Sequence, residues 1–269
     1  MTLAPNAFKA ALRDRRPQIG LWLTMADPYA AEIAGHAGFD WLVIDGEHGP
    51  NDLRSILAQL QVLESSPSEA VVRLPAGEAW MIKQALDIGA RSLIIPMVDS
   101  VEQAEAMVRA VRYPPDGIRG MGAAIARASR FSTIQDYASR AADEICLVVQ
   151  AESRAAMADL ERIAAVDGID GVFIGPADLA ADMGLSGRFD TPEVQAVIEQ
   201  GIATILAAGK PAGILTMNET LNRRYLSLGA SFVAVGSDII EFSAALRRLA
   251  ATYDPASAGS AAPAKPSTY

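Results

Sequence analysis

Two carboxylates, Glu152 and Asp178, each follow an apolar run where a strand of a predicted sheet would end. Acids in that position suit a hard divalent cation, Mg²⁺ or Mn²⁺ ahead of Co²⁺ or Zn²⁺, that keeps open positions for substrate and water. The sequence places no cysteine and at most one histidine near them, which argues against a closed structural zinc site. The alternative is that both acids only cap helices, because Asp178 follows Pro176 and Glu152 precedes Ser153.

The segment Gly175–Leu179 predicts the start of a helix next to Asp178. The first N–H groups of a helix have no partner inside it, so those of Ala177 and Asp178 would be free to bind an anion. A 2-oxo acid would chelate the metal through its carbonyl and one carboxylate oxygen, while these N–H groups receive the other oxygen.

Further polar residues follow other predicted strands. His48 comes after Asp45 and Glu47, where an imidazole suits proton transfer, although a loop histidine that only forms hydrogen bonds is the alternative. Arg73 ends an apolar strand, and a guanidinium in a barrel mouth needs an anionic partner. That partner is an enolate or alkoxide oxygen of the substrate, a structural ion pair with Asp45 or Glu47, or both together. Gln150 ends the strand that leads to Glu152.

Lysine distinguishes two ways of stabilising a carbanion next to a carbonyl, because a Schiff-base mechanism needs a lysine in the active site. The four lysines lie near the N-terminus, within a helix, before a strand at the other end of the predicted barrel, and in the tail: Lys9, Lys83, Lys210 and Lys265. Metal-assisted enolisation is therefore the predicted chemistry for a 2-oxo acid.

Eight short apolar runs have the character of buried strands. They are Ile19–Leu23, Trp41–Asp45, Ala70–Arg73, Ser92–Ile95, Cys146–Gln150, Val172–Ile174, Ala212–Leu215 and Phe232–Val235. Amphipathic segments separate them, and the signals for helix starts include Ser100 as a cap and Thr191-Pro192. Alternating strands and helices predict one (β/α)₈ TIM barrel, whose active site lies at the carboxyl ends of the strands. No G-x-G-x-x-G follows the first strand, which argues against a dinucleotide-binding sheet.

Two segments depart from this alternation. Residues 113–131 are rich in glycine and proline and predict a long loop over the barrel mouth, or else a plain surface connection. We expect residues 1–254 to form the barrel and its C-terminal helix, and residues 255–269 to form an Ala/Ser/Pro-rich tail that docks on a neighbouring subunit.

Composition restricts the class of partner. Of the 269 residues 51% are hydrophobic, the net charge is −9 and no basic run occurs, which argues against nucleic acid or a membrane and favours small molecules. The single cysteine, Cys146, lies in an apolar run and predicts a buried thiol. The absence of a signal segment or long apolar stretch predicts a cytoplasmic protein.

Four motifs together resemble a known family. They are Pro17–Trp22, Gly38–His48, Arg112–Gly120 and Gly171–Leu179. They are similar to those of the metal-dependent class II pyruvate aldolases in the HpcH/HpaI aldolase/citrate lyase superfamily, in particular the 4-hydroxy-2-oxoheptanedioate aldolases. The likeness covers nearly the whole chain.

The resemblance implies roles for the site residues. Glu152 and Asp178 would be the metal ligands, with pyruvate carboxylate bound at the N–H groups of Ala177 and Asp178. Arg73, with Gln150 nearby, would stabilise the carbonyl oxygen, and His48 would be the base.

The resemblance also implies an aspartate that assists the base, here Asp87, from its own or a neighbouring subunit. Members of the family are hexamers, trimers of dimers whose last helix packs on a neighbour's barrel, and they act in aromatic compound catabolism. Leu215, after the seventh strand, is a candidate wall of the aldehyde pocket.

These inferences combine into one reaction. A 4-hydroxy-2-oxo acid would be cleaved reversibly into an aldehyde and pyruvate, or a close 2-oxo acid such as hydroxypyruvate, through a metal-stabilised enolate. Two alternatives remain at this point: an acyl-CoA lyase of the same superfamily, which would need a groove for the nucleotide, and a catalytically silent barrel that binds a metabolite.

Overall fold

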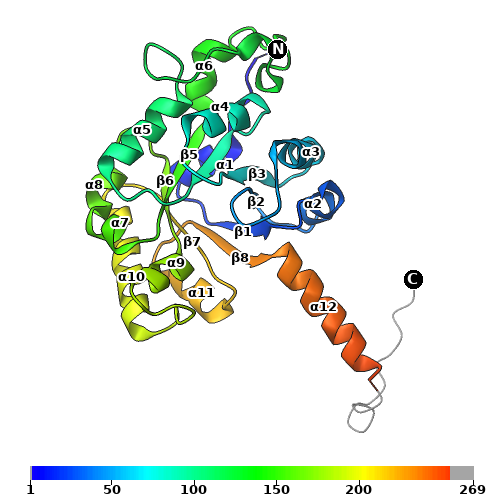
Figure 1. The fold of residues 1–269 in the computed structure, drawn as a ribbon, viewed down its shortest axis with the longest axis vertical. Helices are drawn as coiled ribbons and strands as arrows, with labels where there is room; N and C mark the ends of the chain where they lie inside the picture. The colour runs from blue at the N-terminus through cyan, green and yellow to red at the C-terminus, as the bar shows by residue number, and fades with distance from the viewer. Residues whose placement is uncertain (1, 255–269) are drawn as a thin grey trace.

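Eight parallel strands close into a barrel within residues 2–254, the part of the chain that the computed structural model describes. Helices cover the outside of the barrel and return the chain to the same end before each new strand (Figure 1). The strands are β1 (Gln18–Leu23), β2 (Trp41–Asp45), β3 (Glu69–Arg73), β4 (Ser92–Ile95), β5 (Cys146–Ala151), β6 (Gly171–Ile174), β7 (Ala212–Leu215) and β8 (Phe232–Ser237). The predicted (β/α)₈ barrel is confirmed, with every strand end within two residues of its predicted position.

One helix precedes the first strand, and at least one helix follows each strand. The helices are α1 (Ala7–Arg13), α2 (Pro28–Gly35), α3 (Leu53–Leu63), α4 (Ala79–Asp87), α5 (Val101–Val111), α6 (Tyr137–Glu144), α7 (Arg154–Ala158), α8 (Leu160–Ala165), α9 (Pro176–Asp182), α10 (Pro192–Ala207), α11 (Glu219–Ser227) and α12 (Asp238–Thr252). Two short 3₁₀ turns, Ala123–Ile125 and Arg127–Ser129, lie between α5 and α6. Ser100 caps α5 by accepting the N–H of Gln103, as predicted. Pro192 opens α10, but the side chain of Thr191 forms no capping bond.

Large aromatic side chains fill the inside of the barrel. Trp41 and Phe232 lie there next to Phe8 of α1, which packs at the lower end of the barrel. They fit because glycines face them: a Cβ on Gly20 would lie 2.3 Å from Trp41, and one on Gly213 would lie 2.1 Å from Phe232. A packed interior leaves only the upper ends of the strands for chemistry.

The loop of residues 113–131 does not cover the mouth of its own barrel, so that expectation was wrong. It follows α5, and a helix that runs antiparallel to the strands ends beside their amino ends. Contacts hold it there, because Arg127 donates to the carbonyl of Ile88 and Arg119 donates to Asp87, both at the end of α4.

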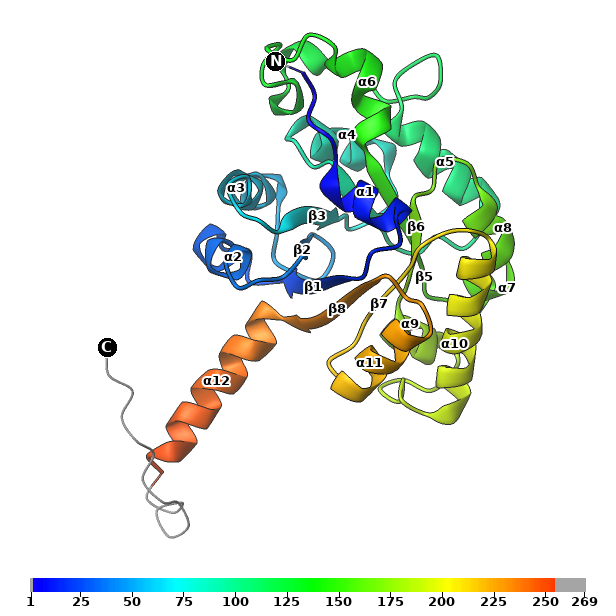
Figure 2. The ribbon, with the colours of Figure 1, turned by 180° about the vertical axis from the view of Figure 1, so that it is seen from behind.

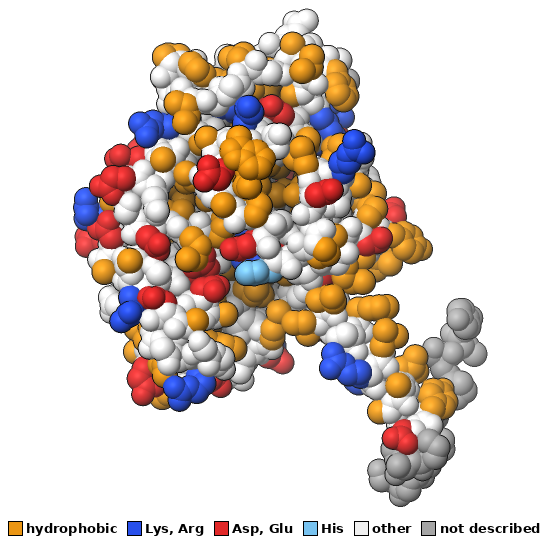
Figure 3. Space-filling model, in the orientation of Figure 1, with side chains coloured by type: hydrophobic (Ala, Val, Ile, Leu, Met, Phe, Trp, Pro, Cys, Tyr) orange, Lys and Arg blue, Asp and Glu red, His pale blue; other side chains and the backbone are white. Residues whose placement is uncertain are grey.

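Helix α12 extends away from the barrel (Figures 1 and 2). It has no buried residue, and its apolar side chains are exposed along its length (Figure 3): Ile239, Ile240, Phe242, Leu246 and Leu249. Its first residue is anchored, because the Asp238 carboxylate accepts hydrogen bonds from Thr24 and from the N–H of Met25. No helix within residues 2–254 has the length and apolar content of a membrane span. The tail predicted over residues 255–269 lies outside the described residues.

Candidate active site

The two-residue period of a strand places three polar side chains at the upper end of the barrel interior. Val43, Val71 and Val148 belong to the interior apolar cluster. Asp45, Arg73 and Gln150 come two residues after them on the same strands, so they face inward one layer higher. Asp45 and Arg73 are also direct partners in the register of β2 and β3. The fold thus brings together residues that are far apart in the sequence.

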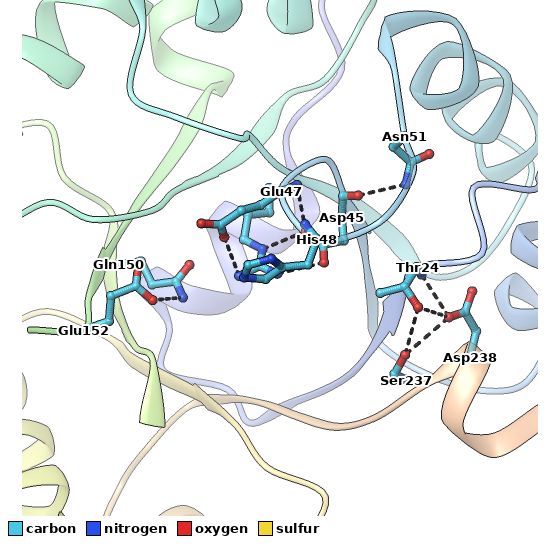
Figure 4. Close-up of polar contacts among 10 residues, drawn as sticks. Thr24, Asp45, Glu47, His48, Asn51, Gln150, Glu152, Ser237 and Asp238 are labelled. Atoms are coloured by element: carbon cyan, nitrogen blue, oxygen red, sulfur yellow. Dashed lines mark hydrogen bonds and ion pairs between the residues drawn. The ribbon is translucent and has the colours of Figure 1, made fainter. Parts of the chain in front are cut away.

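Arg73 forms ion pairs with both acids that the sequence offered as alternatives. Its Nε and Nη2 donate to the two carboxylate oxygens of Asp45, at 2.8 and 2.7 Å. Its Nη1 lies 2.7 Å from Glu47 Oε2, a charge contact without hydrogen-bond alignment. The guanidinium also lies over the ring of Trp22, 5.3 Å from its centroid. These contacts hold the Arg73 side chain in one position between Asp45 and Glu47, both labelled in Figure 4.

Asp45 also shapes the loop that carries His48. Its Oδ1 accepts the N–H groups of Glu47 and His48, at 3.0 and 3.4 Å, and its carbonyl accepts from Asn51. The His48 side chain is exposed at the mouth, and its imidazole has no hydrogen bond within residues 2–254. An exposed imidazole at the mouth, on a loop held by Asp45, is a candidate for proton transfer.

Glu152 is buried, and both of its carboxylate oxygens are engaged. Oε1 accepts the N–H of Met97 at 2.8 Å, and Oε2 accepts from Gln150 Nε2 at 2.6 Å. Burial raises the pKa of Glu152 to about 7, opposed by the Met97 bond, and the charges of Glu47 and Asp178 raise it further. Burial likewise raises the pKa of Glu47, opposed by Arg73. Glu47 and Asp178 are therefore close enough to Glu152 for their charges to repel its carboxylate. Glu47 and Glu152 are both labelled in Figure 4.

Asp178 lies in the first turn of α9, next to Glu152, and is exposed. The turn into this helix passes against the buried acid: a Cβ on Gly175 would lie 2.3 Å from Glu152 Oε2 and 3.1 Å from Gln150 Nε2. Only glycine permits this approach. The N–H groups of Ala177 and Asp178 belong to the first turn, where a helix supplies no internal acceptor.

The mouth carries an excess of negative charge that fits a divalent cation. Four acids gather around one arginine: Asp45, Glu47, Glu152 and Asp178 with Arg73. Carboxylates are ligands that Mg²⁺ and Mn²⁺ prefer, and lone pairs of Glu152 and Asp178 remain for one. Within residues 2–254 no group of three or more His, Cys, Asp or Glu side chains is arranged to hold a metal. The residues present fit two-carboxylate ligation completed by substrate and water.

Two predicted site residues have different outcomes. Leu215 ends β7 at the mouth and packs on the interior cluster, where a wall residue is expected. Asp87 is not brought to His48 within one chain, because it ends α4 beside the amino ends of the strands and pairs with Arg119.

Sequence reasoning missed three contributors. Met97 contributes only its backbone N–H, which donates to Glu152, and its backbone has a left-handed φ of 56°. No side-chain pattern in the sequence reveals such a donor. Gly175 contributes because it has no side chain, which lets the backbone approach Glu152. Its position directly before Pro176 was the signal in the sequence that could have identified it. Arg119 was present only as part of a family motif, although its buried position is a distinct feature of the structure.

A hollow of about 990 Å³ lies away from this site. It is bounded by the N-terminal segment, the end of α3 and residues 127–134, and none of the mouth residues lines it. Its size does not make it the active site, because Glu64, one of the two acids that line it with Glu69, is already paired with Arg127 and Arg130.

Comparison with known proteins gives one consistent match. The family model described as HpcH/HpaI aldolase/citrate lyase matches residues 18–245. The chain is 67% identical to hydroxypyruvate/pyruvate aldolase of Agrobacterium fabrum, over 96% of this chain and 97% of that protein. It is 56% identical to 4-hydroxy-2-oxo-heptane-1,7-dioate aldolase of Salmonella dublin, over 92% and 94%. A crystal structure of an HpcH/HpaI aldolase/citrate lyase family protein from Burkholderia cenocepacia superimposes with a TM-score of 0.88 at 39% identity, over 91% and 98%.

Proposed function

This chain belongs to the HpcH/HpaI aldolase/citrate lyase family, and we propose that its barrel mouth cleaves 4-hydroxy-2-oxo acids into an aldehyde and pyruvate or hydroxypyruvate. Its aldolase relatives make it a carbon–carbon lyase of the pyruvate aldolase type. The observation that carries the proposal is the uncompensated negative charge around Arg73, centred on buried Glu152.

The family is one of metal-dependent aldolases, which supports a divalent metal ion in this chain. We propose that the ion is Mg²⁺ or Mn²⁺. Glu152 and Asp178 would hold it. When bound, it supplies Lewis-acid polarisation of the C2 carbonyl of the substrate. Both carboxylates must be ionised to bind a cation, so metal binding and the raised pKa of Glu152 oppose each other.

The chain's own groups would bind and orient the substrate. The N–H groups of Ala177 and Asp178 receive the substrate carboxylate at the start of α9. Arg73 donates to the oxygen on C2, where charge develops, and its two acids keep the guanidinium in place. Gln150 Oε1 is buried without a hydrogen-bond partner in residues 2–254, so it is free to accept a hydrogen bond from a substrate hydroxyl or a water.

Proton transfer would fall to His48. Its imidazole removes the proton of the C4 hydroxyl, directly or through a water, as the C3–C4 bond breaks and its electron pair forms the enolate of pyruvate. The C4 carbon leaves as the aldehyde, and a proton added at C3 completes pyruvate. We assign Asp87, supplied by an adjacent copy, to orient this imidazole. Leu215 would contact the aldehyde portion.

The assembly is part of the proposal. The exposed apolar side chains of α12 are typical of a helix that packs on another chain, so we propose that α12 is exchanged between neighbours in a hexamer, a trimer of dimers. Sedimentation equilibrium tests it: a species of six chains is expected, and a monomer would contradict it. The cytoplasmic location stays a prediction.

The experiment for the reaction is aldol cleavage before and after metal removal. Cleavage of a 4-hydroxy-2-oxo acid, followed as pyruvate release, should vanish after chelation and return on adding Mg²⁺ or Mn²⁺ in excess of the chelator. Cleavage that continues unchanged after the chelated metal has been separated from the protein would overturn the proposal.

A further inference from the structure

Arg119 is the most enclosed charged side chain outside the mouth. Its side chain is 0% exposed, although it lies in the loop after α5. Nη2 donates to Asp87 Oδ1 at 2.7 Å and to the Tyr137 hydroxyl at 3.2 Å, and the guanidinium lies over Tyr113, 4.4 Å from the ring centroid. A guanidinium stripped of water needs a fixed anion, so this pocket holds Asp87 as firmly as it holds Arg119.

Asp87 is only half engaged by this contact. Its side chain retains 27% exposure, and Oδ2 has no hydrogen bond within residues 2–254. Gly122 leaves room around that oxygen, since even a Cβ there would remain 3.6 Å away. The carboxylate is thus bound through one oxygen and presents the other to the outside of the chain.

The surface near this oxygen has the character of a protein contact. Four large apolar side chains of the same loop are exposed: Ile118, Met121, Ile125 and Phe131. Ile125 is 85% exposed. Contact of such apolar side chains with water is unfavourable, so a cluster of them is typical of a surface that another molecule covers. A second copy of this chain offers a partner for the free Asp87 oxygen, because its mouth presents the imidazole of His48, which has no hydrogen bond within residues 2–254.

We propose that Arg119 is a positioning residue for the neighbouring active site: it fixes Asp87 so that the free Oδ2 meets His48 of an adjacent copy. The inference rests on the proposed function and adds to it a residue that touches neither substrate nor metal. A carboxylate that orients an imidazole must hold one position, and two tyrosines with a buried guanidinium hold it. Glu47, whose charge interacts with His48 in the same chain, is the rival for this task.

Mixed assemblies test the inference. Arg119→Gln should lower kcat for cleavage about a hundredfold with little change in KM, because misplacement of a remote orienting group acts on the chemical step. Assemblies formed by co-expressing Arg119→Gln with His48→Ala chains, each with its own affinity tag, should recover activity. With equal random mixing about a quarter of the sites combine an intact mouth with an intact loop.

The partner combinations define the result. Asp87→Asn mixed with His48→Ala should recover activity in the same way, whereas Arg119→Gln mixed with Asp87→Asn should not, because every loop is then defective. If mixtures with His48→Ala give only the average of their parents, the inference is wrong. If Arg119→Gln does not assemble, Arg119→Lys and the Asp87→Asn mixtures decide by the same criteria.

A matched control lies in the same loop. Arg127 pairs with Glu64 and the carbonyl of Ile88 but not with Asp87, so Arg127→Gln should keep kcat close to that of the unmodified enzyme. An equal loss in both variants would show that the loop matters only for structure. If the unmodified enzyme shows no metal-dependent cleavage, the proposed function itself is refuted. Failure of the proposed function is thus distinguishable from failure of the inference about Arg119.

Discussion

Arg73 and Arg119 are both buried guanidiniums bound to an aspartate, but their charge surroundings differ. Arg73 has two acids in contact and two more beside them, so the mouth keeps negative charge that it does not neutralise. Arg119 has one acid and two tyrosine rings, so its pocket is balanced. Unneutralised charge points to a bound cation and to chemistry, whereas a balanced pair points to placement of a group.

The largest effect should come from removing charge at the mouth. Glu152→Gln should lower cleavage at least about a thousandfold and abolish Mn²⁺ binding measured by calorimetry, because the buried metal ligand is lost. Asp182→Asn is the matched control, since Asp182 lies on the same helix as Asp178 but is exposed and paired with Arg154. If Glu152→Gln binds Mn²⁺ normally, the charge at the mouth serves another purpose.

Replacing Arg73 should affect both activity and stability. Arg73→Met removes the donor to the C2 oxygen, and cleavage should fall about 100- to 1000-fold. It also leaves buried Asp45 without its cation, which should lower the free energy of unfolding by about 3–5 kcal/mol in denaturant titrations. Arg119→Met, by contrast, should leave Mn²⁺ affinity unchanged. Equal losses of metal affinity in both variants would remove the distinction between the two arginines.

Gly175 tests how closely α9 must approach Glu152. Gly175→Ala places a Cβ 2.3 Å from Glu152 Oε2, so the carboxylate must move and cleavage should fall about a hundredfold. Gly236→Ala is the control near the mouth, because its Cβ would lie 3.3 Å from the flexible end of Leu21 and 3.9 Å from the Glu241 side chain. Retained activity in Gly175→Ala would mean that the Glu152 position is not critical.

The pH dependence should be the mildest effect. The folded pKa of Glu152, about 7, exceeds its ordinary 4.5, so the folded chain binds this proton more tightly than the unfolded chain. The metal-free protein therefore loses stability from this group as the pH rises from 4.5 to about 7. Metal must displace the proton, so Mn²⁺ affinity should fall about tenfold per pH unit below about 7. The rise in Tm on adding Mn²⁺ should be larger at high pH, and an equal rise on both sides of pH 7 would contradict this.

The sequence predicted the mouth better than its surroundings. Asp45, Arg73, Gln150 and Glu152 lie at or directly after the ends of apolar strands. The barrel brings all strand ends to one rim, so local pattern was sufficient. Of the two interpretations of residues 113–131, the loop over the mouth was wrong, because composition identifies a loop but not the helix end on which it packs. Asp87 lies in a helix, and its environment depends on Arg119, which is 32 residues away.

Exchange of the pyruvate methyl protons with D₂O, followed by NMR, tests the central claim most directly, because it reports enolate formation without an aldehyde. The enzyme loaded with Mg²⁺ or Mn²⁺ should catalyse exchange, the chelated enzyme should not, and Glu152→Gln should remain inactive after metal is added back. Exchange that proceeds equally well in the chelated enzyme or in Glu152→Gln would contradict a metal-dependent enolate site at this mouth.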